Sequence, residues 1–154
     1  MGPMKTYAEL RTESAFARPT ILVDLDGTLA IKGDRDPFDW SRVGEDLPNE
    51  PVVFVVKHLQ LFTTIVVVSG RDEICRWQSE MWLYARGIFF HQLFMRPHKD
   101  NRPDHVVKKE IYEQAIKLGY KNVLAAIDDR KQVLDMWREL GLFTFDVGNG
   151  KGDF

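Results

Sequence analysis

Acidic side chains occur in two pairs, each directly after an apolar run. Asp24 and Asp26 end the stretch ILVDLD, and Asp128 and Asp129 follow the apolar residues 123–127. Side chains two positions apart on a strand point to the same side, so Asp24 and Asp26 face one place. Unit charges about 4 Å apart repel by roughly 4 kcal/mol at an effective dielectric constant near 20. These carboxylates, if gathered together, therefore need protons or a cation.

Mg²⁺ is the cation that this set of residues favours, because it takes carboxylate and phosphate oxygens as ligands. No cysteine and histidine pair has the spacing of a zinc site, and Cys75 is the only cysteine. An isolated D-x-D is most often a solvated turn or a helix cap. Here the motif follows an apolar run, leads into Gly27 and Thr28 and is matched by a second acid pair, which favours a functional site.

The elements that would position these side chains alternate along the chain. Strands are predicted at residues 21–25, 64–68, 89–95, 123–127 and 143–147, and helices at residues 51–62, 72–86, 104–118 and 133–140. The alternation indicates an α/β fold, a Rossmann-like three-layer sandwich with a mostly parallel five-stranded sheet. Ligands of such sheets bind beyond the carboxyl ends of the strands. Asp24, Ser69 and Asp128 are therefore expected at one edge of the sheet.

Smaller features add expectations that the structure can test. Asn49 and Asp104 are expected to cap helices. Residues 33–50, rich in Asp, Gly and Pro, are expected to form a polar surface segment with little regular structure and no large cap domain. Apolar residues at helical spacing are expected in the core: Trp77, Met81, Trp82, Met136 and Trp137. Cys75 has no histidine or other base in its pattern, so a buried, inert thiol is expected.

Composition limits the class of protein. The chain has 154 residues, of which 44% are hydrophobic, enough for one sizeable core. We expect one domain, residues 19–154, after an N-terminal extension of residues 1–18, whose first three residues look like a remnant of an expression tag. The formal net charge of −2 gives no general attraction to nucleic acid, so anion binding must rest on a local cluster. A single cysteine, no signal-peptide pattern and no apolar run of about 20 residues indicate a cytoplasmic protein without a membrane span.

Four motifs in order resemble those of the haloacid dehalogenase superfamily of phosphohydrolases. They are DLDGT, Ser69 in VVVSG, Lys108 in DHVVKKE and the pair in AIDDR. Longer stretches, DLDGTLAIKGDRDPFDW, IVVVSGRDE, RPDHVVKKEI, AIDDRKQVLDMWRELG and the terminal GDF, are similar to the 3′-phosphatase domains of bacteriophage polynucleotide kinase–phosphatases. The resemblance runs from residue 21 to the end of the chain.

The resemblance implies a role for each matching residue. Asp24 would be the nucleophile that forms an aspartyl-phosphate, and Asp26 would be the general acid and base. Residues implied to bind the substrate phosphate or to position the groups that do are Thr28, Arg35, Ser69, Gly70, Arg71, Asp104 and the catalytic Lys108. Ligands implied for Mg²⁺ are Asp24, the backbone carbonyl of Asp26, Asp128 and Asp129.

Three of these assignments have a plain structural alternative. Lys108 could be a solvated helix lysine like Lys109, but Asp104 and Lys108 lie at i and i+4 on one helix face, so the aspartate can orient the ammonium group. Lys109 belongs to the neighbouring, outer face. Arg35 and Arg71 could be ordinary surface arginines.

The expected substrate is a 3′-phosphate on a nucleic acid end or on a 3′-nucleotide. Four basic residues before the helix at 104–118, namely Arg96, His98, Lys99 and Arg102, could follow a nucleic acid backbone or form a solvated loop. Phe38 and Trp40 could stack a base or close the core. No G-x-x-x-x-G-K-[ST] motif occurs, and GNGKGD near the end is too short, so no kinase activity is expected. A separate kinase or ligase is a candidate partner, and the oligomeric state is left open.

Rival interpretations come from other classes of protein. A nucleotidase or small-metabolite phosphatase would use the same scaffold. A signalling receiver domain also combines acidic residues, Mg²⁺, a Ser/Thr and a Lys, but its adjacent acid pair belongs at the end of its first strand, whereas here that pair comes late. A non-catalytic partner of a separate kinase or ligase is the third alternative. For a phage-encoded protein, the expected location is the cytoplasm of the host cell.

Overall fold

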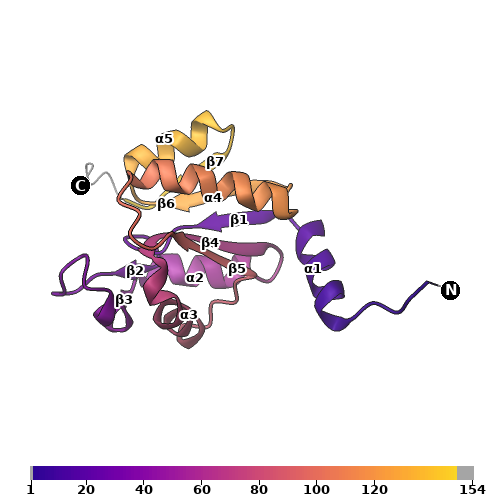
Figure 1. The fold of residues 1–154 in the computed structure, drawn as a ribbon, viewed down its shortest axis with the longest axis horizontal. Helices are drawn as coiled ribbons and strands as arrows, with labels where there is room; N and C mark the ends of the chain where they lie inside the picture. Colours follow the sequence, from indigo (N-terminus) through magenta and orange to yellow (C-terminus); the bar gives the residue numbers. More distant parts are fainter. Residues whose placement is uncertain (1, 149–154) are drawn as a thin grey trace.

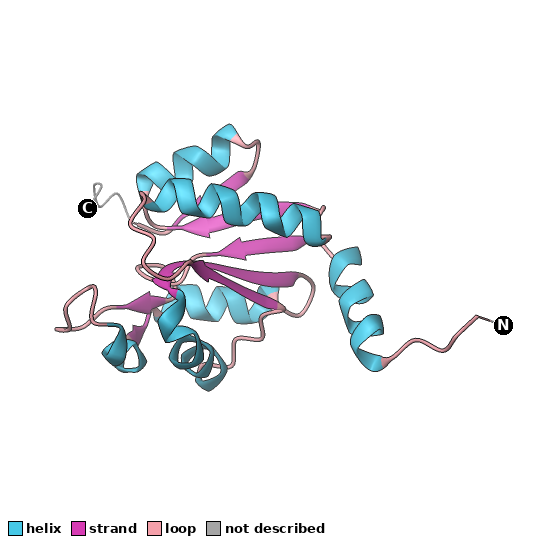
Figure 2. Ribbon diagram, in the orientation of Figure 1, coloured by secondary structure: helices cyan, strands magenta, loops and turns pink. Residues whose placement is uncertain are grey.

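The fold is an α/β sandwich, seen in a computed structural model that describes residues 2–148. A five-stranded sheet lies between α4 and α5 on one face and α2 and α3 on the other (Figures 1 and 2). In chain order the elements are α1 (Tyr7–Ala17), β1 (Thr20–Val23), β2 (Ala30–Ile31), the 3₁₀ helix η1 (Trp40–Glu45), β3 (Leu47–Pro48), α2 (Glu50–Leu59), β4 (Thr64–Asp72), the 3₁₀ helix η2 (Glu73–Cys75), α3 (Arg76–Ala85), β5 (Gln92–Arg96), α4 (Asp104–Leu118), β6 (Val123–Asp128), α5 (Lys131–Glu139) and β7 (Phe143–Asp146).

The main sheet is wholly parallel and has the strand order β5-β4-β1-β6-β7, which confirms the predicted fold class. Its central strands are apolar on both faces because both faces are covered by helices. Ile21 and Val23 of β1 pack in the core on the α2 and α3 side, whereas Leu22 packs on the α4 and α5 side. Successive side chains of β1 therefore pack against the helical layers on opposite faces of the sheet.

Strand β4 is longer than predicted and irregular at its end. Ser69 pairs with Met95 and Asp72 pairs with Arg96, so Gly70 and Arg71 are extra residues on the β4 side. A bulge of this kind bends the strand and redirects side chains. Helix α3 consequently begins at Arg76 after the short η2, not at residue 72.

Of the two predicted helix caps, Asn49 is confirmed at its N-cap position, whereas the prediction for Asp104 was wrong. Asn49 occupies the N-cap position of α2 but makes no capping hydrogen bond; its amide donates to the Thr28 carbonyl oxygen at 2.9 Å. At α4 the N-cap is Pro103, and Asp104 is the first helical residue. Tertiary partners thus take both polar side chains away from the local backbone.

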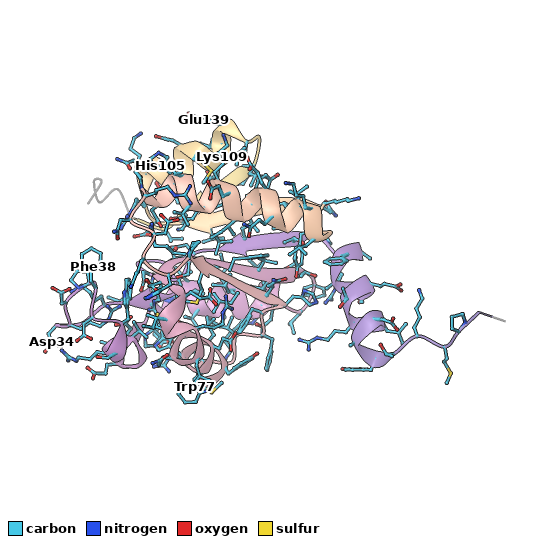
Figure 3. The ribbon with its side chains drawn as sticks, in the orientation of Figure 1. Asp34, Phe38, Trp77, His105, Lys109 and Glu139 are labelled. Carbon is cyan, nitrogen blue, oxygen red and sulfur yellow. The ribbon has the colours of Figure 1, made fainter. Side chains whose placement is uncertain are left out.

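Only some of the residues predicted to lie in the core are buried, depending on the face of the helix that they occupy. Trp82, Met136 and Trp137 are buried as predicted. The prediction was wrong for Trp77, which is 69% exposed and points away from the sheet in Figure 3, and for Met81. Helix α3 turns Trp82 and Cys75 toward the sheet instead, and burial raises the pKa of the Cys75 thiol.

The segment after β1 is more ordered than predicted. It forms the antiparallel pair β2 and β3 with η1 between them, beside the carboxyl end of the main sheet (Figure 1). Arg35, Val43 and Asp46 are buried in it, so it is not merely a surface loop. Among the described residues, no helix combines the length and apolar character needed to cross a bilayer.

Candidate active site

Asp24 and Asp128 come to the same place because their strands are parallel neighbours. The Asp24 N–H donates to the Ile127 carbonyl oxygen at 3.0 Å, directly beyond the β1–β6 ladder. The chain runs outward from β1 through β4 to β5 and then returns to β6 on the other side of β1. Such a switch point leaves a crevice beyond the strand ends, where ligands of open α/β sheets bind.

The turn after Asp24 requires a glycine. Gly27 has φ +82°, and its N–H donates to the Ala30 carbonyl oxygen at 2.8 Å. A Cβ atom at this position would lie 2.1 Å from Asp129 Oδ2. The backbone of the first motif therefore approaches the second acid pair too closely for any side chain.

Lys108 connects the two acidic strand ends. Its side chain is 1% exposed, and its ammonium donates to Asp24 Oδ1 at 2.7 Å and to Asp128 Oδ2 at 2.9 Å. Asp104 Oδ2, one helical turn earlier, lies 3.5 Å from the same nitrogen. Lys109 projects from the outer side of α4 (Figure 3). The structure thus places Lys108, and not Lys109, in the acidic cluster.

Burial and charge act on this cluster in opposite directions. Burial, and then the neighbouring charge of Asp128, raises the pKa of Asp24 well above its ordinary value, although Lys108 opposes the shift. Burial also raises the pKa of Asp129. Desolvation alone would lower the pKa of Lys108, but Asp104, Asp128 and Asp24 together raise it well above its ordinary value. The cluster therefore holds one buried cation, the Lys108 ammonium, and contains more carboxyl groups than this single charge can neutralise.

The surplus carboxylates suit a divalent cation. Asp24, Asp128 and Asp129 each offer an oxygen atom, and these atoms lie within 4.8 Å of one another. Thr28 Oγ1 donates to Asp24 Oδ2 at 2.8 Å and lies 3.4 Å from Asp129 Oδ1. An all-oxygen set of this charge is what Mg²⁺ selects. The residues present fit Mg²⁺, and ligation through the Asp26 carbonyl remains a prediction.

Asp26 is held by Arg71. Arg71 Nη2 donates to Asp26 Oδ1 at 2.7 Å and to Asp46 Oδ2 at 2.7 Å, and its Nη1 donates to Ser79 Oγ at 3.1 Å. The guanidinium is fully buried, whereas the Asp26 side chain is 40% exposed. The bulge in β4 thus turns Arg71 inward, where it bridges the first motif and the protein interior.

Arg35 is buried and forms an ion pair with Asp46. Its Nε and Nη2 donate to the two carboxylate oxygens of Asp46, each at 2.7 Å, and its side chain is buried. Asp26 Oδ1 lies 3.7 Å from Arg35 Nη2. Arg35 is therefore no surface arginine: its guanidinium lies inside the protein, beside Asp26, and its contact with a substrate phosphate stays a prediction.

Asp46 is the residue of the candidate site that sequence reasoning missed. Its buried carboxylate holds Arg35 and Arg71 together, and its carbonyl oxygen accepts from Trp82 Nε1 at 2.7 Å. No motif marks Asp46, which lies in the segment expected to be a surface loop. Two nearby arginines without obvious partners were the only signal that a buried acid was needed.

Asp104 connects the lysine to the end of β4. It accepts from Arg96 Nη2 at 3.2 Å, and Arg130 Nη1 lies 4.0 Å from its Oδ2. A Cβ atom at Gly70 would lie 2.2 Å from Asp104 Oδ1, so the carboxylate packs directly on this glycine. Burial alone would raise the pKa of Asp104, but Lys108 and both arginines lower it. Arg130, directly after the second acid pair, is a cation that the sequence analysis did not single out.

Ser69, Phe38 and Trp40 lie in different settings. Ser69 is fully buried at the end of β4, where its Oγ accepts from the Arg71 N–H at 3.1 Å. Trp40 packs partly buried against the core, whereas Phe38 is exposed at the tip of its loop (Figure 3). The two rings are in edge-to-face contact, with 6.2 Å between their centroids, and Phe38 is the more exposed of the two.

Together, the parallel sheet and the acidic cluster at its switch point define a phosphatase of the haloacid dehalogenase type. The chain belongs to the family of polynucleotide kinase PNKP phosphatase domains, whose sequence model matches residues 18–154. This confirms the resemblance found in the sequence.

Two kinds of relative share this similarity. A protein of Autographa californica nuclear polyhedrosis virus, described as "Putative bifunctional polynucleotide kinase/RNA ligase", is 36% identical over 128 residues, which are 80% of this chain and 18% of that protein. A chain in the structure of the Pnkp1/Rnl/Hen1 RNA repair complex is 39% identical, with a TM-score of 0.81 over 90% of this chain and 44% of that chain. This chain therefore spans less than half the length of either relative.

A more distant structure shares the fold alone. The D,D-heptose 1,7-bisphosphate phosphatase from B. bronchiseptica, solved with magnesium and phosphate, is 17% identical, with a TM-score of 0.59 over 83% of this chain and 79% of that chain.

Proposed function

We propose that this domain is a Mg²⁺-dependent phosphatase that removes the 3′-phosphate from nucleic acid ends through an aspartyl-phosphate on Asp24. The observation that carries the proposal is the placement of Lys108 between Asp24 and Asp128 at the carboxyl end of the sheet. Family membership supports the reaction class. The names of the longer relatives, which refer to a polynucleotide kinase and to RNA repair, support a nucleic acid substrate.

In the first step, an Asp24 carboxylate oxygen attacks phosphorus as the bond from phosphorus to the 3′-oxygen breaks. Asp26 donates a proton to the leaving oxygen, which departs as a 3′-hydroxyl. Arg71 and Arg35, both fastened to Asp46, hold the Asp26 carboxyl at the rim for this transfer. Thr28 fixes the orientation of the Asp24 carboxylate through its hydrogen bond to Oδ2.

In the second step, Asp26 takes a proton from water as that water attacks the phosphorus of the aspartyl-phosphate. The bond from phosphorus to Asp24 breaks and inorganic phosphate leaves. Lys108, Ser69 and the backbone N–H groups of the first motif would hold the equatorial oxygens in both steps. Bound Mg²⁺ would supply a Lewis acid that offsets the charge between Asp24 and the phosphoryl oxygens.

The substrate test compares three phosphomonoesters. We expect turnover of a 3′-phosphorylated oligonucleotide and of a 3′-mononucleotide to exceed turnover of a 5′-mononucleotide, because the proposed leaving group is a 3′-oxygen. Preference for the 5′-ester would favour the nucleotidase alternative and contradict the proposal.

The covalent step is tested with Asp24→Asn, which keeps the side-chain shape but removes the nucleophile. Rapid quenching with a 3′-³²P-labelled oligonucleotide should trap labelled wild-type protein, and Asp24→Asn should trap none and release no phosphate. Asp34→Asn is the matched control, because Asp34 is exposed at the far tip of its loop (Figure 3). A stable label without release of phosphate would indicate a receiver-like phosphoprotein.

The sequence contains no G-x-x-x-x-G-K-[ST] motif, and we propose that this chain has no kinase activity. A separate kinase or ligase remains a proposed partner, and the cytoplasm remains the proposed location.

A further inference from the structure

The four basic residues that precede α4 do not act as one patch. Arg96 donates to the carbonyl oxygens of Gly70 and Arg102, at 2.8 and 2.6 Å, and to Asp104. Arg102 forms ion pairs with Asp100 and Glu110. Both guanidinium groups are thus used within the protein, and only His98 and Lys99 remain to meet a ligand.

The Asp72 carboxylate orients the His98 ring. Its Nδ1 lies 2.9 Å from Asp72 Oδ1, while the His98 side chain is 52% exposed and that of Asp72 only 13%. Asp72 is itself fixed, because Oδ1 accepts from the Ile74 N–H at 2.9 Å and Oδ2 from the Lys99 N–H at 3.0 Å. A carboxylate that binds one ring nitrogen orients the ring and leaves the other, Nε2, for a ligand.

Lys99 adopts a backbone conformation that side chains other than glycine rarely take. Its φ is +63°, and it is the only non-glycine residue with a positive φ in the part of the chain that the structure describes. Its N–H bond to Asp72 holds this conformation. Among the described residues none forms an ion pair with its ammonium group, so the lysine is presented to solvent beside His98.

Both residues lie beside the proposed reaction centre. They belong to the connection from β5 to α4, at the end of the sheet where β1 and β4 also end (Figure 1). Asp72 is three residues beyond Ser69, which is at most about 10 Å along the chain. Arg96 ties the same connection to Gly70 and Asp104, which adjoin Lys108. A ligand held at His98 and Lys99 would therefore lie next to, but outside, the site for the terminal phosphate.

We propose that His98 and Lys99 form a subsite for the internucleotide phosphate that adjoins the phosphorylated 3′ end. The inference rests on the proposed function and extends it, because it makes the domain prefer the end of a polymer over a mononucleotide. A His98 ring with a proton on each nitrogen would donate to Asp72 from Nδ1 and to a phosphate oxygen from Nε2, and Lys99 adds an ammonium beside it. This is a contact to the backbone and not to bases, so it favours no sequence.

The test compares a 3′-phosphorylated single-stranded oligonucleotide with a 3′-mononucleotide, which has no internucleotide phosphate. His98→Gln and Lys99→Gln should each lower kcat/KM on the oligonucleotide about three- to tenfold, mainly through KM. Neither should change kcat/KM on the mononucleotide. Lys99→Gln should also lower the slope of log(kcat/KM) against log[salt] on the oligonucleotide by about 0.7, the loss of one phosphate contact. The matched control is Lys109→Gln, an exposed lysine on the outer side of α4, which should act like wild type on both substrates.

A chemically altered substrate separates a direct contact from an indirect effect. An oligonucleotide with a neutral methylphosphonate at its last internucleotide linkage should lose at least as much kcat/KM with the wild type as either variant loses with the native strand. The same substrate should cause a smaller loss in each variant than in the wild type, because each variant has already lost one of the two contacts. Equal turnover of the neutral and native strands by the wild type, or equal losses of the variants on both native substrates, would overturn the subsite alone. Absence of wild-type turnover on both 3′-phosphorylated substrates would overturn the proposed function and this inference with it.

Discussion

Lys108 carries its charge on a side chain that is only 1% exposed, and its carboxylate neighbours stabilise that charge. Asp24, Asp128 and Asp104 surround its ammonium, and two of these contacts are shorter than 3 Å. Removal of one partner from a buried ion pair is strongly destabilising, because the desolvation of the remaining charge is no longer offset. The lysine is thus needed both for the fold and for the proposed chemistry.

Replacement of Lys108 by Met should lower the free energy of unfolding by about 3–5 kcal/mol in Mg²⁺-free buffer, because Asp24 and Asp128 lose their shared cation. Lys109→Met, one residue further on the exposed face, should change it by less than about 0.5 kcal/mol. Urea denaturation of the two variants beside the wild type measures the difference. Equal stability of both variants would show that the ion pairs of Lys108 with Asp24 and Asp128 do not stabilise the fold.

Asp46 balances the charges of two buried arginines, Arg35 and Arg71, as the carboxylates around Lys108 balance its ammonium. Asp46→Asn keeps the side-chain volume but leaves Arg35 and Arg71 with a neutral partner in the interior. We expect a loss of about 3 kcal/mol or more in the free energy of unfolding and a fall in kcat with little change in KM, because Asp26 is no longer held. Asp34→Asn, which breaks only an exposed pair with Arg42, should cost less than about 1 kcal/mol. A normal kcat in folded Asp46→Asn would show that the network of Asp46, Arg35 and Arg71 does not contribute to catalysis.

At the scale of elements, the irregular end of β4 organises the site. The two extra residues at this position let Arg71 turn inward and let Asp104 approach the backbone at Gly70. A regular strand would alternate its side chains and could not place both groups in this way. The bulge is therefore the local feature that connects α4 to the first motif.

Gly70→Ala tests this connection. The added Cβ would lie 2.2 Å from Asp104 Oδ1, so the carboxylate must move away from the lysine that it orients. We expect kcat to fall about 10- to 100-fold and the free energy of unfolding to fall by about 1–3 kcal/mol. Gly44→Ala is the control, since a Cβ there meets no atom within 4 Å and should leave both quantities nearly unchanged. Steady-state kinetics and denaturation of the two variants decide whether this close approach matters.

At the scale of the whole molecule, α1 is attached at the end of the sheet opposite the site (Figure 1). The Phe16 ring packs edge-on against Tyr120, with 4.9 Å between ring centroids, and against His91. The Ala15 carbonyl oxygen accepts from Thr64 Oγ1 at 2.7 Å. A small aromatic cluster and one hydrogen bond thus join the N-terminal segment to β4 and to the residues that flank β5 and α4.

His91 should make this attachment sensitive to pH. Burial, and then the charge of Arg11, lowers the pKa of His91 below its ordinary value. The unfolded chain therefore takes up the proton first, near pH 6.5, and the free energy of unfolding should fall as the pH drops from there through the lower pKa of the folded state. His91→Gln, which does not titrate, should lack this part of the pH dependence. Parallel profiles for the two proteins in denaturation at pH 5 to 8 would contradict the assignment.

Much of the site could be predicted because its residues follow the ends of apolar strands. A parallel sheet brings strand ends to one edge whatever the loops do, so Asp24, Ser69 and Asp128 had to converge. Helix phase predicted that Lys108 and not Lys109 would turn inward, since Asp104 lies one turn earlier on the same face. These inferences use only periodicity and the order of elements.

The exposed positions were harder to predict because several helices have two apolar faces. Trp77 and Trp82 both fit helical spacing, and only the placement of α3 against the sheet decides that Trp82 is covered. The basic run before α4 shows the same limit. Arg96 and Arg102 use their guanidinium groups within the protein, whereas His98 binds Asp72 through Nδ1 alone and the Lys99 ammonium has no ion-pair partner among the described residues. Local sequence does not contain those partners.

By itself, the sequence determined the parallel α/β fold, the family and the acidic residues at the strand ends, because strand and helix periods and motif order are local properties. Only the tertiary structure decided that Asp46 fastens Arg35 and Arg71, that Asp104 rests on Gly70, and which cations face outward. Each of these outcomes depends on charged groups far apart in the chain that share one buried volume, where desolvation forces them to pair.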